Sequence, residues 1–127
     1  MKQEITANDM LNALNTDGHI ALYINFDVSK ATIKPESKPI VGQIVEMLKT
    51  DGALKISIEG HTDNSGTPQK NKALSEQRAQ AVSEAIAGQG IDKQRLSTIG
   101  WWQHKPIAGN KTEEGKAKNR RVELVKK

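Results

Sequence analysis

Apolar residues alternate with polar ones in four stretches of the chain, a pattern typical of half-buried β-strands. These stretches are rich in Ile, Leu or Val at every second position and comprise residues 20–26, 54–60, 95–100 and 120–125. In the last stretch Val122 and Leu124 share one face, because side chains alternate across a strand. The pattern therefore predicts four strands.

Two longer segments carry apolar residues three and four positions apart, which is the spacing of one face of a helix. The first helix is expected over residues 35–50, with an apolar stripe at Ile40, Val41, Ile44, Val45 and Leu48. The second is expected over residues 68–87, where Thr67 is suited to cap the helix and Pro68 to occupy its first position.

The remaining segments have weaker patterns. Residues 2–18 are expected to form a linker or a brief helix beginning at Asn8, and residues 101–118 a long loop that can include one helical turn. The order is then strand, helix, strand, helix, strand, loop, strand. Two crossover helices predict an α/β fold, an α+β sandwich of the βαβαββ type, with a mixed four-stranded sheet covered by helices on one face. Residues 19–127 are expected to form the domain.

Composition narrows the class of protein. A chain of 127 residues is one domain, and its 3% aromatic content leaves the core to Val, Ile, Leu and Ala. The absence of cysteine excludes disulfides, thiolate nucleophiles and cysteine-based zinc sites. No apolar run approaches the roughly 20 residues of a membrane span. The polar start shows no signal peptide, so any targeting signal is expected upstream.

The net charge of +4 is unevenly distributed. Residues 111–127 carry seven Lys or Arg and three Glu, whereas residues 1–110 carry twelve of each sign. The excess is compatible with an anionic partner or with a solvated basic terminus.

Arg78 does not fit the pattern of the second helix. It falls on a four-residue stripe that is otherwise apolar, together with Leu74, Val82 and Ile86. An unpaired buried charge costs several kcal/mol, roughly, so Arg78 needs a partner, and Asp63 is the nearest candidate. The two side chains can pair with each other, or together they can grip a molecule that carries both charges.

Short motifs stand in a fixed order along more than a hundred residues. They are Phe26-Asp27, Glu59-Gly-His-Thr-Asp-Asn-Ser-Gly66, Asn71, Leu74-Ser-Glu-Gln-Arg-Ala79, Gly90-Ile91, Arg95-Leu96, Pro106-Ile107-Ala108, Asn110, and Gly115 followed by Asn119-Arg-Arg-Val-Glu123. In this combination the chain resembles the OmpA-like domain, the peptidoglycan-binding module of outer-membrane porins, peptidoglycan-associated lipoproteins and flagellar-motor stator subunits.

The resemblance implies a wall anchor that binds the diaminopimelate residue of the peptidoglycan stem peptide, without catalysis, cofactor or metal. In this family pattern Asp63 binds the ammonium group of the ligand and Arg78 binds its carboxylate. The residues expected beside them are Asn71, Asp27, Thr62 and one of the paired arginines, Arg121 in preference to Arg120. The resemblance also implies a periplasmic place at the Gram-negative outer membrane and cell wall, with membrane attachment only through an upstream segment, and it leaves a homodimer open.

The sequence departs from the family pattern at two places and is open to three rival functions. Lys116 stands where family members often carry arginine, and Trp101-Trp102 replaces smaller residues or tyrosine; both changes concern the pocket rim. The rival functions are an enzyme using His61, Thr62 and Asp63 with His104 or Glu59, a metal site of His61, Asp63 and His104, and nucleic-acid binding by the basic terminus. The enzyme lacks a nucleophile or carboxylate-pair motif, the metal site lacks ligand spacing, and the basic terminus lacks interleaved aromatic residues. The sequence therefore favours a binding module over all three.

Overall fold

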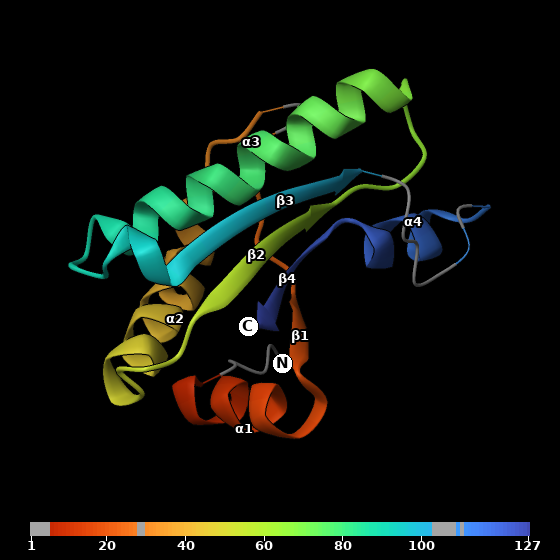
Figure 1. Ribbon diagram of the computed structural model, residues 1–127. Coiled ribbons are helices and arrows are strands. Elements are labelled where there is room, and N and C mark those ends of the chain that lie inside the picture. Colours follow the sequence, from red (N-terminus) through yellow and green to blue (C-terminus); the bar gives the residue numbers. More distant parts are fainter. Residues whose placement is uncertain (1–5, 28–29, 103–108, 110) are drawn as a thin grey trace.

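The computed structural model (Figure 1) describes residues 6–27, 30–102, 109 and 111–127. The helices and strands follow in the order α1 (Ala7–Asp17), β1 (His19–Leu22), the 3₁₀ turn η1 (Pro35–Ser37), α2 (Lys38–Thr50), β2 (Ile56–His61), α3 (Pro68–Ala87), the 3₁₀ turn η2 (Lys93–Arg95), β3 (Leu96–Trp102), α4 (Glu113–Asn119) and β4 (Arg121–Lys126). None of the helices in the described part of the chain is long and apolar enough to cross a bilayer.

The four strands form one mixed sheet in the order β1-β4-β2-β3. Strands β2 and β3 are parallel, whereas β4 is antiparallel to both of its neighbours, so that Leu124 lies between Ile20 and Ile58. The prediction of a mixed four-stranded α+β sheet is confirmed. The basic C-terminal segment contributes a central strand of the sheet (Figure 1).

The core lies between the sheet and its helices. Buried residues come from every layer and include Met10 and Leu14 of α1, Ile44 and Leu48 of α2, Ile56 and Ile58 of β2, Val82 and Ile86 of α3, and Val122 and Leu124 of β4. The brief helix expected within residues 2–18 is present as α1, which begins one residue before the predicted start. The expected domain boundary at residue 19 stays a prediction.

Local capping explains where the helices begin. The hydroxyl of Thr6 accepts from the N–H of Asp9, and the Asp9 carboxylate accepts from the N–H of Thr6, which forms a capping box at the start of α1. Thr67 caps α3 as predicted, by accepting from the N–H of Lys70. The helix expected from Pro35 starts with a separate 3₁₀ turn, because Pro39 has no N–H to donate to the carbonyl of residue 35.

The first strand is shorter than predicted. It was expected to reach Phe26, but the ladder ends at Leu22, whose partner Val122 is the second residue of β4. Beyond that point the backbone bonds elsewhere: the N–H of Asn25 donates to the Ser37 hydroxyl at 2.8 Å. Phe26 makes only an isolated bridge with Ile33. Because the pairing with β4 stops at Leu22, residues 23–26 have no strand partner there and turn toward α3.

The expected loop over residues 101–118 is also wrong in part. Strand β3 continues to Trp102, and α4 occupies residues 113–119, with the Thr112 hydroxyl accepting from the N–H of Gly115. The residues between them that carried predictions, His104, Pro106, Ile107, Ala108 and Asn110, lie outside the described residues.

Two glycines let α3 approach the sheet closely. A Cβ at Gly60 of β2 would collide with the backbone carbonyl of Ser75, and one at Gly100 of β3 would collide with Glu76 and Ser75. The buried stripe of α3 therefore begins with small or polar residues and consists of Asn71, Ser75, Ala79, Val82 and Ile86. This corrects the predicted stripe, since Leu74 and Arg78 lie beside it and are only half-buried.

Arg95 ties the end of α2 to the sheet. Its guanidinium donates to the carbonyls of Leu48 and Asp51 at 2.7 Å each and to that of Leu54 at 3.0 Å. These carbonyls end α2 and lead into β2, so one side chain satisfies backbone groups that the helix terminus leaves without partners.

Candidate functional site

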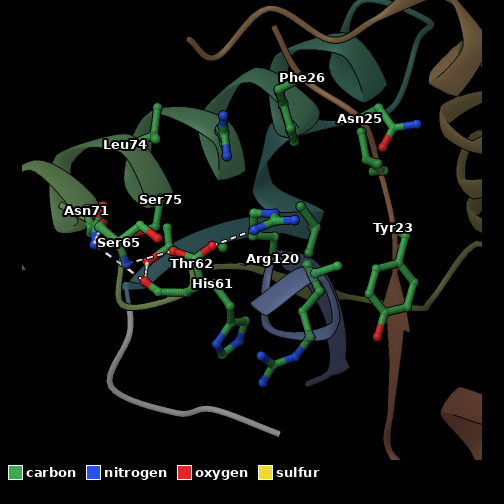
Figure 2. A pocket seen from close by; sticks show the side chains of 17 residues that line it. Tyr23, Asn25, Phe26, His61, Thr62, Ser65, Asn71, Leu74, Ser75 and Arg120 are labelled. Carbon is green, nitrogen blue, oxygen red and sulfur yellow. Dashed lines mark hydrogen bonds and ion pairs between the residues drawn. The ribbon is translucent and has the colours of Figure 1, made fainter. Parts of the chain in front are cut away.

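A pocket of about 660 Å³ opens where β2 ends and α3 begins (Figure 2). It is lined by residues 23–26 after β1, by the end of β2 and the turn that follows, by the first half of α3, and by the junction of α4 with β4. Because β2 and β4 are antiparallel, His61 at the end of β2 pairs with Arg121 at the start of β4. The sheet topology thus brings residues distant in sequence to one mouth.

Asp63 lies at the bottom of this mouth, with its side chain 8% exposed. One carboxylate oxygen, Oδ1, accepts from the N–H of Ser65 at 2.7 Å, which closes a tight turn after β2. The other, Oδ2, accepts from Nη1 of Arg120 at 2.5 Å. Burial alone would raise the pKa of Asp63, but the hydrogen bonds from Ser65 and Arg120 outweigh it and hold the pKa below the usual aspartate value.

Arg78 reaches the pocket from α3 and is bonded to backbone carbonyls. Its Nε donates to the carbonyl of Lys30 at 2.9 Å and its Nη2 to that of Asp27 at 3.4 Å. The guanidinium lies over the ring of Phe26, 4.9 Å from the centroid. Burial lowers the pKa of Arg78, the charge of Arg120 lowers it further, and the charge of Asp63 opposes both.

Asp63 and Arg78 therefore do not form the internal ion pair that was one of the two expectations for them. Arg120 is the cation that contacts Asp63, and its Nη2 also donates to Glu113 Oε1 at 3.1 Å. Figure 2 shows Arg120 pointing from the end of α4 toward the turn after β2. The hydrogen bond with Asp63 raises the pKa of Arg120.

Arg121 lines the same pocket, but its guanidinium is directed to other partners. Its side chain is 2% exposed, with Nε donating to Glu123 Oε2 at 2.6 Å and Nη1 to the carbonyl of Asn119 at 3.3 Å. His61 Nε2 lies 3.8 Å from the same Glu123 oxygen. The preference for Arg121 over Arg120 is thus not supported by contacts with Asp63. Arg120 caps α4 and precedes β4, so strand alternation does not govern its direction.

The other predicted site residues support the turn that carries Asp63. Asn71 is 7% exposed, and its Nδ2 donates to the carbonyl of Ser65 at 2.7 Å and to that of Asp63 at 3.4 Å. The Thr62 hydroxyl donates to the Asp63 carbonyl at 2.9 Å. Asp27 contributes its main-chain carbonyl to Arg78, and its side chain is absent from the pocket lining described above.

Sequence reasoning missed three residues that line the pocket and one that contacts Arg120. Tyr23 lines the pocket beside residues 24–26, 47% exposed, and its hydroxyl donates to the carbonyl of Lys118 at 3.3 Å. Ser65 is signalled by the Asp-x-Ser spacing, which favours a turn in which a side-chain oxygen accepts from the backbone two residues on. Nothing in the sequence pattern pointed to Phe26 as the surface beneath Arg78, or to Glu113 as a partner of Arg120.

The arrangement bears on the rival functions as well. His61 is buried beside Glu123 and lines the pocket, whereas Glu59 accepts from the indole N–H of Trp101 at 2.5 Å. In the described ranges no group of three or more His, Asp or Glu side chains could hold a metal ion. The described pocket thus offers one carboxylate and several guanidinium groups for binding.

Comparison with known proteins identifies the family. The family model of OmpA matches residues 25–120. The chain belongs to the OmpA family.

Curated relatives of this OmpA-family domain come from several bacterial groups. It is 42% identical over 110 residues to Outer membrane protein Omp38 of Acinetobacter baumannii, covering 86% of this chain and 31% of that protein. It is 41% identical over 102 residues to the Probable lipoprotein YiaD of Escherichia coli, covering 80% and 47%. It is 37% identical over 119 residues to the Peptidoglycan-binding protein ArfA of Mycobacterium tuberculosis, covering 92% and 35%. The chain spans about a third to a half of the length of these relatives.

Solved structures confirm the OmpA-like fold. The peptidoglycan-associated lipoprotein of Burkholderia pseudomallei superposes with a TM-score of 0.74 at 30% identity, covering 84% of this chain and 89% of that one. A putative MotB-like protein of Desulfovibrio vulgaris superposes with a TM-score of 0.79 at 21% identity, covering 95% and 88%.

The matched part of the OmpA domain holds nearly all of the predicted site. Six of the seven predicted residues fall within residues 25–120, and Arg121 follows directly. Most of the pocket lining therefore lies in the part of the chain that the family model matches.

Proposed function

We propose that this domain binds peptidoglycan non-covalently, through the diaminopimelate residue of the stem peptide, and so anchors a cell-envelope protein to the wall. The ligand is held and not turned over. The family membership supports the class of function, and the chemistry of the pocket supports the ligand.

The observation that carries the proposal is that Asp63 and Arg78 line one pocket without pairing with each other. A carboxylate and a separate guanidinium at one mouth suit a ligand end that bears both an ammonium and a carboxylate group. Arginine offers a planar fork that matches a carboxylate with two hydrogen bonds, which lysine cannot offer. We assign the ligand's ammonium to Asp63 and its carboxylate to Arg78.

The remaining predicted residues have supporting roles in this proposal. Asn71 and Thr62 fix the turn that presents Asp63, and the carbonyl of Asp27 orients Arg78. We expect Arg120, which contacts Asp63, to meet a second ligand group there, and Arg121, which lines the pocket, to close its floor.

The names of relatives support the location. ArfA is named a peptidoglycan-binding protein, the Burkholderia protein is a peptidoglycan-associated lipoprotein, and Omp38 is an outer membrane protein. We infer a place in the periplasm, at the outer membrane and cell wall, with any membrane attachment made through an upstream segment. The homodimer that the sequence left open stays an open part of this proposal.

Affinity per site is expected to be modest. A hydrogen bond to a charged group contributes about 1.5–3 kcal/mol, and part of that offsets the entropy lost on binding. Firm anchoring then comes from many copies along one wall, because linked sites raise the effective concentration of each other.

The test is co-sedimentation with purified sacculi and calorimetric titration with meso-diaminopimelate. Asp63→Asn and Arg78→Lys are each expected to weaken binding by about 1–3 kcal/mol while both variants stay folded and unfold cooperatively. Glu84→Gln is the matched control, since Glu84 is exposed on α3 outside the pocket lining, and it should bind as wild type does.

Two results would count against the proposal. Wild-type affinity in both site variants together with large stability losses would make Asp63 and Arg78 structural residues. Release of soluble muropeptides by the purified protein, above a heat-inactivated control, would show turnover of the wall.

A further inference from the structure

The carboxylate proposed to bind the ligand's ammonium already holds a cation. Asp63 Oδ1 accepts from the N–H of Ser65 and Oδ2 from Arg120, and the side chain is 8% exposed. Little of the carboxylate remains accessible beside these two donors. An incoming ammonium group must therefore displace Arg120 from Oδ2, or at least share that oxygen with it.

Arg120 is exposed enough to move away from Asp63, but it finds no equally strong partner when it does. Its side chain is 41% exposed, and its other contact is with Glu113, which is 81% exposed. An ion pair between such exposed groups contributes only about 0–1 kcal/mol, because water screens it. The exchange of Arg120 for a plain ammonium at Asp63 thus replaces one cation by another and leaves the guanidinium without an equivalent partner.

The charge of the mouth makes the same exchange unfavourable. Asp63 is one negative group beside two positive ones, Arg78 and Arg120, and the charge of Arg120 lowers the pKa of Arg78. The guanidinium of Arg121 also lines the pocket, but it is paired with Glu123. A ligand with only an ammonium group adds a third positive charge. A ligand with an ammonium and a carboxylate on the same carbon adds none, and its carboxylate can accept from the displaced guanidinium.

We propose that Arg120 is a specificity-determining residue that competes for Asp63 and admits only ligands whose carboxylate can take up its guanidinium. The pocket then selects an α-amino acid head group over the plain ammonium of a lysine side chain, because the plain ammonium cannot compensate Arg120 for the loss of Asp63. This inference rests on the proposed function of the pocket. Under this inference, the discrimination between the two head groups arises from the competition at Asp63 as well as from the carboxylate contact at Arg78.

The test compares two probes that differ in one carboxylate. Nα-acetyl-lysine methylamide presents a plain ammonium, and the corresponding Nα-acetyl-diaminopimelate methylamide presents the ammonium and carboxylate together. Wild type is expected to prefer the diaminopimelate probe by at least about tenfold. In Arg120→Gln the lysine probe should bind more tightly while the affinity of the diaminopimelate probe changes little, so that the preference falls by about tenfold.

A matched variant separates the contact from general charge. Lys118→Gln removes one positive charge from an exposed position on the same helix and should leave the preference unchanged. Should Arg120→Gln not fold, Arg120→Lys keeps the charge but not the fork, and the preference is expected to fall in the same direction. Circular dichroism melting of each variant establishes that the compared proteins are folded.

Two outcomes distinguish the failure of this inference from failure of the proposed function. In the first outcome, wild type binds the diaminopimelate probe, but the preference in the Arg120 variants stays within about twofold of the wild-type preference, or it falls equally in Lys118→Gln. This outcome overturns the role of Arg120 and leaves the proposed function standing. No binding of either probe or of sacculi by wild type overturns the proposed function itself.

Discussion

Replacing Gly60 by alanine tests the closest approach between the sheet and the helix that carries Asn71 and Arg78. The new Cβ would lie well inside van der Waals distance of the Ser75 carbonyl oxygen, with the carbonyl carbon at 3.0 Å and Cα at 3.3 Å. These atoms belong to the backbone of α3, so no side-chain rotation relieves the collision. The helix has to move.

The size of the effect follows from that movement. Ordinary contacts of a Cβ begin near 3.4 Å, so the first half of α3 must retreat by about 1 Å and loosen its packing against β2 and β3. Overpacking of this kind costs about 1–3 kcal/mol. For a domain of this length we expect a fall in the thermal midpoint of about 5–12 °C. Ligand binding should weaken as well, since the shift moves Arg78 relative to Asp63.

Thermal and chemical unfolding of Gly60→Ala measures the expected loss of stability, and Gly42→Ala is the control. Gly42 lies inside α2 with nothing within 4 Å of its would-be Cβ, so alanine there should stabilise by about 0.5–1 kcal/mol through helix propensity. An equal or higher midpoint for Gly60→Ala than for wild type would refute the close packing of α3 on the sheet.

Three further predictions concern stability. Arg95→Ala removes three hydrogen bonds to the backbone carbonyls around the end of α2 and should lower the free energy of unfolding by about 2–3 kcal/mol, whereas Lys93→Ala in the same 3₁₀ turn is exposed and should change it by less than about 0.5 kcal/mol. Deletion of residues 119–127 removes β4 from the middle of the sheet and should abolish cooperative unfolding, so a truncated protein with a wild-type melting transition would contradict the strand order. Because the pKa of Asp63 is lower in the folded than in the unfolded protein, its ionised carboxylate stabilises the fold at pH values above the unfolded pKa of about 3.9, and this contribution is lost as the pH falls through the folded pKa. The free energy of unfolding of Asp63→Asn in urea should therefore depend less on pH below about pH 5 than that of wild type.

Local patterns predicted the elements that carry strong periodicity. Alternation placed β2, β3 and β4 correctly to within a few residues, and Thr67 marked the start of α3. The short helix α4 was expected only as one possible helical turn in a loop, because seven residues with a buried glycine and asparagine show no apolar stripe. The end of β1 was missed for a different reason. It is set by where the ladder with β4 stops, about a hundred residues away, and not by the residues of β1.

In the candidate site too, some features follow from local sequence and others from pairing between distant strands. The sequence indicated which residues gather at the mouth, because Asp63, Asn71 and Arg78 are separated by one turn and part of one helix. It could not indicate that Asp63 pairs with Arg120, since the two are 57 positions apart and meet only because β4 lies beside β2. Periodicity also placed Arg78 on the buried stripe, whereas the close approach at Gly60 turns a neighbouring row of small residues toward the sheet.

These pairings give the two arginines different consequences for the proposed ligand. Arg78 donates to the neutral carbonyls of Lys30 and Asp27. Exchange for a ligand carboxylate replaces neutral acceptors by an ionised one and so adds the attraction between opposite charges. Arg120 already has a carboxylate as acceptor, so its exchange between Asp63 and the ligand is nearly neutral in energy. Affinity should therefore arise mainly at Arg78 and selectivity mainly at Arg120. Arg78→Lys is expected to weaken binding of the diaminopimelate probe more than Arg120→Lys does, and calorimetric titration of both variants with that probe decides it; equal losses would show that the two arginines act as one carboxylate clamp.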